Sequence, residues 1–148
     1  MQVTNQTYHF ESVVNDSENY RMVCNEFNSV IAPIYGDQRE ALNKIAAATD
    51  RVCEVLIDDL SKTLAGILVY KSSPTDEFGA YGAHQALELK TLFVVDAEKQ
   101  SGKGIGSLLI NRIKVVAFKE NKFENIVVTV SDEKPESQTF FQGWFKGR

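Results

Sequence analysis

The chain has 148 residues, of which 43% are hydrophobic and 24% are charged, a composition typical of one globular domain with a substantial core. Its net charge is -4, so it lacks the surplus of lysine and arginine that binding to a phosphate backbone needs. No apolar run approaches the roughly 18 residues of a membrane-spanning helix, and Met1–Thr7 has no signal-peptide pattern. We therefore expect one cytoplasmic domain over residues 1–148, with neither nucleic acid nor a membrane as its partner.

Cysteine and histidine are too few and too scattered to predict a metal site. Cys24 and Cys53 lie far apart in the sequence, and we interpret them as free thiols in a reducing compartment. His9 and His84, the only histidines, have no cysteine or histidine neighbour at the spacing of metal ligands. We expect no bound metal.

The N-terminal part of the chain predicts a strand and a long helix. Weak alternation of apolar and polar residues indicates a strand over Tyr8–Val14. Apolar residues at spacings of three and four predict an amphipathic helix over Glu18–Ile31. Pro33 and Gly36 are expected to end this helix, because proline removes a donor and glycine favours a chain reversal.

A second helix and a strand hairpin are predicted next. Asp37, followed three residues later by Glu40, indicates a helix start. The segments Arg51–Asp59 and Leu64–Tyr70 are rich in valine, isoleucine and leucine, and the short polar connection between them predicts an antiparallel pair. The residues Lys71–Gly82 contain proline and glycine and indicate an exposed loop.

The C-terminal part predicts a strand–helix–strand crossover. Ala86–Val95 and Asn125–Ser131 indicate strands, Gly102–Lys119 indicates the helix between them, and Glu136–Gln142 a short last helix. Such a crossover pairs its two strands in parallel. The long helix should direct its apolar residues to the core: Ile105, Leu108, Leu109, Ile113 and Val116.

Three glycines at alternate positions, Gly102, Gly104 and Gly106, mark the turn between the first of these strands and the helix. Glycine has no Cβ, so backbone N–H groups there can approach a ligand closely, and a helix N-terminus favours an anion. The pattern therefore predicts a bound phosphate or pyrophosphate, although its spacing fits neither a P-loop nor the dinucleotide fingerprint. The alternative is that the glycines only allow tight packing of strand against helix.

This stretch resembles the GNAT superfamily of N-acetyltransferases. The family motif is Gln/Arg-x-x-Gly-x-Gly/Ala after a strand such as Leu92–Val94, and Gly104 and Gly106 occupy its glycine positions. Ser101 stands where the family has Gln or Arg, with Gln100 beside it. The resemblance implies an α+β fold with a mixed, mostly antiparallel central sheet, a splayed parallel strand pair and flanking helices.

The resemblance also implies acetyl-CoA as the cosubstrate. Its pantetheine arm would lie between the two splayed strands, pairing with backbone groups of Phe93 and Val95, with an oxyanion-stabilising N–H near Phe93 or Val94. The pyrophosphate would rest on Gln100–Gly106. The residues implied in cofactor binding are Phe93, Val94, Val95, Gln100, Ser101, Gly102, Lys103, Gly104, Ile105, Gly106, Ser107 and Ser137.

Glu88 is the candidate catalytic residue. It looks like the position from which some family members use a carboxylate as general base, often through water. The alternative is an ordinary carboxylate on a strand face, paired with Lys90 or another cation. His84 is a second candidate base, but we favour the interpretation that it is an ordinary loop residue.

The general acid is where the sequence departs from the family. The last helix of the family often carries a tyrosine near the sulfur of CoA, and the aligned Phe141 has no hydroxyl to donate. Ser131 or Ser137 could hydrogen-bond to CoA, and the thiolate could leave without a dedicated acid. Three tyrosines elsewhere remain alternatives: Tyr35, Tyr70 and Tyr81.

A GNAT domain normally continues past its last helix into two more strands, whereas this sequence stops at Arg148. We expect a second copy of the chain to cover this end as a homodimer. The alternatives are a tail that folds back over its own edge and a truncated chain. The aromatic residues near this end are Phe140, Phe141, Trp144 and Phe145.

Two functions remain. The first is an enzyme that moves the acetyl group of acetyl-CoA to the primary amine of a small molecule or peptide by direct attack, which Glu88 favours. The second is a non-catalytic acetyl-CoA-binding module for regulation or protein interaction, which Phe141 favours. Acidic residues around the early helices and the following loop would suit a cationic amine, or serve only solubility: Asp16, Glu18, Glu26, Asp37, Asp76 and Glu77.

Overall fold

The computed structural model describes residues 7–100 and 102–128. One sheet runs in sequence order through β1 (Tyr8–Ser12), β2 (Arg51–Asp58), β3 (Leu64–Lys71), β4 (Ala86–Val94) and β5 (Asn125–Val128). Neighbouring strands from β1 to β4 are antiparallel, and β5 pairs in parallel with β4. The predicted α+β class, with a mostly antiparallel sheet and a parallel last pair, is confirmed. Of the predicted last strand, residues 129–131 lie outside the described part, as does the last helix.

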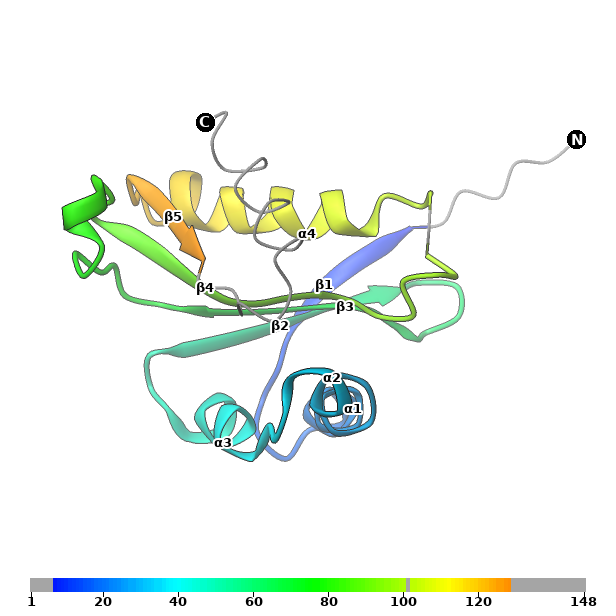
Figure 1. The fold of residues 1–148 in the computed structure, drawn as a ribbon. Helices are drawn as coiled ribbons and strands as arrows, with labels where there is room; N and C mark the ends of the chain where they lie inside the picture. The colour runs from blue at the N-terminus through cyan, green and yellow to red at the C-terminus, as the bar shows by residue number, and fades with distance from the viewer. Residues whose placement is uncertain (1–6, 101, 129–148) are drawn as a thin grey trace, which may run out of the picture.

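Helices cover both faces of the sheet. They are α1 (Glu18–Glu26), α2 (Ala32–Tyr35), α3 (Arg39–Ala47) and α4 (Ile105–Lys114), and π-helical turns extend α1 and α4. Figure 1 shows α4 on one face and α1, α2 and α3 on the other. None of the helices in the described ranges is long and apolar enough to cross a membrane.

The first helical segment does not end before Pro33, as the sequence predicted, but continues to Tyr35. A π-helical turn over Phe27–Ile31 lies ahead of the proline. The wider turn accommodates the proline ring and its missing N–H without breaking the helix. Gly36, with a φ of +99°, then ends the segment as expected.

Two apolar clusters fill the space on either side of the sheet. On the α4 face, Leu87 and Leu89 pack against α4. On the other face, Val55 and Ile67 pack against residues of α1 and α3. Leu108, predicted to face the core, is 37% exposed, and Ile110 is buried in its place. The difference arises because the core-facing stripe of α4 is centred between Leu109 and Ile113.

A β-bulge interrupts β4 in its middle. Thr91 pairs with Val69, but Leu89 pairs with Tyr70, so Lys90 is an extra residue with no partner on β3. Such a bulge shifts the alternation of side chains by one residue. Each side chain of β4 after the bulge therefore points to the face opposite the one it would have in an unbroken strand.

The leucines of β4 show the effect of this shift. Leu87 and Leu89 before the bulge, and Leu92 and Val94 after it, all belong to the cluster on the α4 face. Without the extra residue, one of the two pairs would point to the opposite face. The bulge therefore keeps one face of β4 continuously apolar along its whole length.

Candidate functional site

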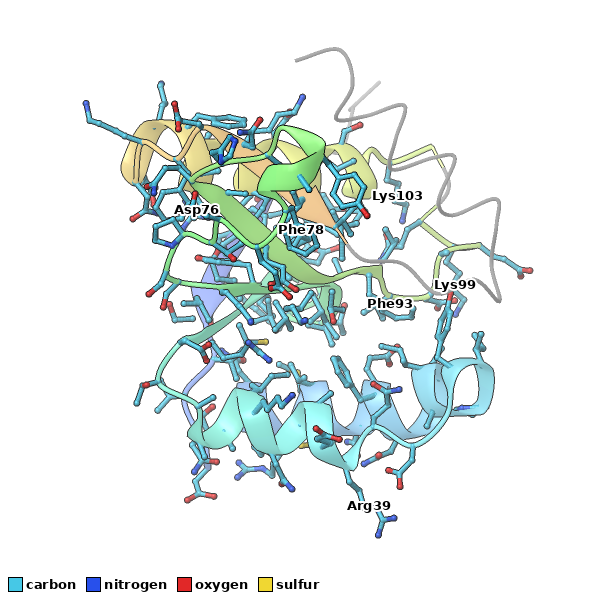
Figure 2. All side chains as sticks on the ribbon, turned by 60° about the vertical axis from the view of Figure 1, so that its left-hand side comes forward. Arg39, Asp76, Phe78, Phe93, Lys99 and Lys103 are labelled. Carbon is cyan, nitrogen blue, oxygen red and sulfur yellow. The ribbon has the colours of Figure 1, made fainter. Side chains whose placement is uncertain are left out.

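The turn between β4 and α4 is shaped by left-handed glycines. Gly102 has a φ of +79° and Gly104 a φ of +76°, conformations that L side chains rarely adopt. A Cβ placed on either glycine would meet nothing within 4 Å, so the space beside both is open. Gly106 differs, because it is an ordinary helical position near Val94. Figure 2 shows Lys99 and Lys103 on this turn, after Phe93.

The N-terminus of α4 presents unpaired donors beside these glycines. Gly104 is the N-cap, and the N–H of Leu108 donates to its carbonyl at 3.0 Å. Among the described residues, the N–H groups of Gly106 and Ser107 have no recorded hydrogen-bond partner. Ile105 is buried in the core and anchors the turn. Unpaired N–H groups at a helix N-terminus are suited to binding an anion.

The edge of β4 that faces away from β3 lies next to this turn. Within the described ranges, β5 pairs with β4 only as far as Leu89. The N–H of Val95 donates to the carbonyl of Ala65 at 2.9 Å, so the expectation that the Val95 N–H is free for a ligand is wrong. Since hydrogen bonds alternate along an antiparallel pair, the backbone groups of Phe93 also face β3. Those of Leu92 and Val94 point to the opposite edge.

Several predicted site residues lie outside the described part of the chain. They comprise the motif position, both candidate serines on the C-terminal side and the aromatic residues near the end. Nothing in the fold bears on their predicted roles. They are Ser101, Ser131, Ser137, Phe140, Phe141, Trp144 and Phe145.

Glu88 is buried on β4 and forms ion pairs with two lysines. Its side chain is only 6% exposed, with Oε2 at 3.0 Å from Nζ of Lys90 and Oε1 at 3.5 Å from Nζ of Lys71. Burial raises the pKa of the Glu88 carboxyl, but the hydrogen bond and charge of Lys90, together with the charge of Lys71, outweigh it and lower the pKa. The carboxylate is therefore ionised at neutral pH. The pairing with Lys90, the alternative predicted from the sequence, is present.

A cavity of about 350 Å³ opens between the sheet and α3. The sheet contributes Arg51, Lys90 and Thr91 to its lining, and α3 contributes Lys44 and Ile45. Lys90, which lines this cavity, is also the lysine that donates to Glu88. The bulge thus brings a polar stretch of β4 to the wall of the cavity.

The tyrosines considered as general acids do not share one environment. Tyr70 is buried on the α4 face and donates its O–H to Glu54 at 2.7 Å, and burial with this carboxylate raises its pKa. Tyr35 and Tyr81 are exposed, the latter by 87%. His84 lies against Gly79 in the loop after β3. None of these described residues lines the cavity beside Lys90.

The cysteines stay unpaired, and one of them is chemically shielded. Both Cys24 and Cys53 are free thiols. Burial raises the pKa of Cys53 to about 12, so this thiol is not an accessible nucleophile. No group of three metal-ligating side chains occurs within residues 7–100 and 102–128.

The ion network around the buried Glu54 on the α4 face was not predicted from the sequence. Arg112 donates to both oxygens of Glu54, from Nε at 2.8 Å and from Nη2 at 3.0 Å. Its Nη1 reaches Glu120 at 3.0 Å, and its guanidinium lies 5.9 Å from the centre of the Phe10 ring. The signal available in the sequence was Glu54 itself, a carboxylate inside a largely apolar strand, since a buried charge requires a partner.

Solved structures resemble this fold, although no protein-family model and no curated protein matches the sequence. Ribosomal-protein-alanine N-acetyltransferase from Brucella melitensis biovar Abortus 2308 aligns with a TM-score of 0.65 at 11% identity, over 93% of this chain and 90% of that one. Aminoglycoside N-acetyltransferase AAC(6')-Iy in complex with CoA aligns with a TM-score of 0.67 at 11% identity, over 97% and 90% of the chains.

A plant protein extends the likeness. NAA60 from Arabidopsis thaliana, in complex with a bisubstrate analogue, aligns with a TM-score of 0.64 at 17% identity, over 93% of this chain and 78% of that one. At these identities the likeness concerns the fold. The order of strands and helices agrees with it. The chain therefore has the fold of the GNAT N-acetyltransferases.

Proposed function

We propose that this protein is an N-acetyltransferase that uses acetyl-CoA and acetylates a primary amine. The observation that carries the proposal is the open turn at the N-terminus of α4, where left-handed Gly102 and Gly104 leave space beside unpaired backbone donors. A diphosphate is the group that such a turn binds well. Two similar structures, one in complex with CoA and one with a bisubstrate analogue, support the same ligand class.

The chain offers a separate element for each part of the cosubstrate. The pyrophosphate would accept from the N–H groups of Gly106 and Ser107, with Lys103 supplying a positive charge nearby. The pantetheine amides would pair with the backbone of Leu92 and Val94, which faces away from β3. Ser101, Gln100 and the side chain of Ser137 remain proposed contacts.

Bound acetyl-CoA would supply the acetyl group as a thioester. An N–H on the free edge of β4, at Leu92 or Val94, would stabilise the negative charge that develops on the acetyl oxygen during attack. The new C–N bond forms as the C–S bond breaks, and the amine loses one proton. Glu88 would receive that proton through water, because its ionised carboxylate lies on the strand that carries the edge.

The second candidate is an acetyl-CoA-binding module without turnover. It is favoured by Phe141, which lacks the hydroxyl that the family places near the sulfur, and by a cavity lining that does not include Tyr35, Tyr70 or Tyr81. Both candidates require cofactor binding. Only the first requires release of free thiol with an amine.

Two measurements test the proposal in sequence. Calorimetric titration with acetyl-CoA should show one binding site per chain, and a thiol-release screen across amines should then identify at least one acceptor. Absence of binding at millimolar acetyl-CoA would contradict both candidates. Binding without thiol release for any amine would leave the non-catalytic module.

A further inference from the structure

Arg51, at the start of β2, is a buried arginine with an incomplete set of partners. Its side chain is only 7% exposed, yet it lines the cavity between the sheet and α3. Its Nη1 has no hydrogen-bond partner among the described residues, and the ion-pair contact to Oδ1 of Asp50 is 3.7 Å long. A buried guanidinium N–H without an acceptor is costly, so the site favours a ligand that supplies one.

Arg51 belongs to a row of charges that crosses three strands. Arg51 pairs with Lys71 across β2 and β3. Lys71 in turn makes the 3.5 Å ion pair with Oε1 of Glu88 on β4. That oxygen is buried and also lacks a full hydrogen-bond partner among the described residues. The row therefore has a guanidinium N–H without an acceptor at one end, whereas Glu88 at the other end is already held by Lys71 and Lys90.

The other charged groups around the cavity are already engaged or exposed. Asp37 is paired with Arg39, which points away from the sheet in Figure 2. Glu40 is 84% exposed and forms an ion pair with Lys44 at 3.4 Å. These carboxylates lie on the solvent side of the cavity, so they do not neutralise the buried Arg51.

Resting on the proposed acetyltransferase function, we propose that the acceptor is an amine that also carries a carboxylate, and that Arg51 binds this carboxylate. The carboxylate of such an acceptor would supply the hydrogen-bond acceptor that Nη1 of Arg51 lacks, and its amine would be directed to the proposed thioester at the edge of β4. Guanidinium groups bind carboxylates with charge-assisted hydrogen bonds. Arg51 thereby acts as a specificity-determining residue.

The strand order also sets the separation of the two groups on the acceptor. Arg51 lies on β2 and the proposed thioester at the edge of β4, two strands away. Adjacent strands are about 4.8 Å apart, which gives roughly 10 Å between these backbones. An acceptor whose amine is next to its carboxylate is too short to span this separation. The geometry favours an amine on a chain of several carbons, such as the side-chain amine of a basic amino acid.

The test compares acceptors that differ only in the carboxylate. Thiol release is measured for the native protein with 6-aminohexanoate and with its uncharged amide, 6-aminohexanamide. The acid should have a kcat/KM about tenfold to a hundredfold higher, as expected for a hydrogen bond to a charged group. Shorter acids, from glycine upward, should be acetylated progressively less well than 6-aminohexanoate.

Variants then assign the effect to Arg51. Arg51→Gln should bring the ratio of acid to amide close to one, and Arg51→Lys should recover part of it. Arg21→Gln, which changes an exposed arginine on α1, is the matched control and should leave the ratio unchanged. Titration of 6-aminohexanoate into the CoA-bound protein gives a readout that does not need turnover, and Arg51→Gln should weaken this binding at least tenfold.

The outcomes separate this inference from the proposed function. Equal acetylation of acid and amide by the native protein would overturn the role of Arg51 and leave the acetyltransferase standing. The same conclusion follows if amines without a carboxylate are the only acceptors. Failure of acetyl-CoA to bind would instead overturn the proposed function. Melting curves of each variant check that the ratio is measured on folded protein.

Discussion

The two faces of the sheet carry buried charges in different states of completion. On the α4 face, Arg112 binds both oxygens of Glu54, and Tyr70 donates to one of them. On the α3 face, Arg51 Nη1 and Glu88 Oε1 each lack a hydrogen-bond partner among the described residues. A buried polar group left unpaired costs about 1–3 kcal/mol. The complete network stabilises the fold, whereas we propose that the incomplete one binds a ligand.

The largest expected effect is the loss of the complete network. Arg112→Met removes the partner of Glu54 and should lower the free energy of unfolding by about 3 kcal/mol, because a buried carboxylate is left without its cation. Chemical denaturation measures this difference. Arg21→Met, on an exposed arginine, should change it by less than about 0.5 kcal/mol. If Arg112→Met lowered the free energy of unfolding no more than Arg21→Met does, the ion pairs of Arg112 would contribute no more than ordinary surface pairs.

Gly104→Val tests the turn between β4 and α4, the proposed binding site of the cofactor diphosphate. The substitution puts a β-branched side chain at a φ of +76° and fills the open space beside the turn. Acetyl-CoA affinity should fall by about a hundredfold or more, since the side chain displaces the bound diphosphate and backbone strain of about 1–3 kcal/mol disturbs the donors.

Gly82→Val is the matched control for this experiment. Gly82 has a φ of +83° and an equally open surrounding, but lies in the loop after β3. It should lose comparable stability while keeping the affinity measured by calorimetry. Retained affinity in Gly104→Val would show that the turn does not hold the cofactor.

Glu88→Gln sharpens the interpretation of the incomplete face. If Glu88 receives the proton of the amine, the rate of thiol release should fall about a hundredfold, with acetyl-CoA affinity unchanged. Glu124→Gln, on an exposed carboxylate, is the control. A variant with the native rate but a lower melting temperature would make Glu88 a purely structural partner of Lys71 and Lys90.

The smallest expected effect is a pH dependence of stability. The pKa of Glu88 is lowered in the folded protein by the lysines around it, against the opposing effect of burial. Ionised Glu88 therefore stabilises the fold above its unfolded pKa, about 4.3, and this contribution is lost as the pH falls through the lower folded value. The difference in melting temperature between the native protein and Glu88→Gln should be constant near pH 7 and shrink below about pH 4. A difference that grew on acidification would contradict the direction of the shift.

The order of elements and the glycine turn could be predicted from the sequence because both depend on local patterns. Apolar periodicity located the helices and strands, with ends that shifted by a few residues. Gly102 and Gly104 indicated the turn because their missing Cβ atoms are a local property. The exception was Pro33, where a π-helical turn carried the helix onward.

The partners of the buried charges could not be predicted, because they lie far apart in the sequence. Glu54 and Arg112 are separated by 58 positions, and the row from Arg51 to Glu88 depends on the register of three strands. Register is set by packing and turns together. The sequence identified Lys90 as a partner of Glu88, but it left Lys71 and Arg51 unnoticed.

The single extra residue in β4 has a consequence for any alignment of related chains. Upstream of Lys90 the odd-numbered leucines face α4, whereas downstream the even-numbered Leu92 and Val94 do so. A relative without the bulge must be aligned with a one-residue gap at this point. Otherwise every position after the bulge is assigned to the wrong face of the sheet, and a residue on the cavity side is mistaken for one that packs against α4.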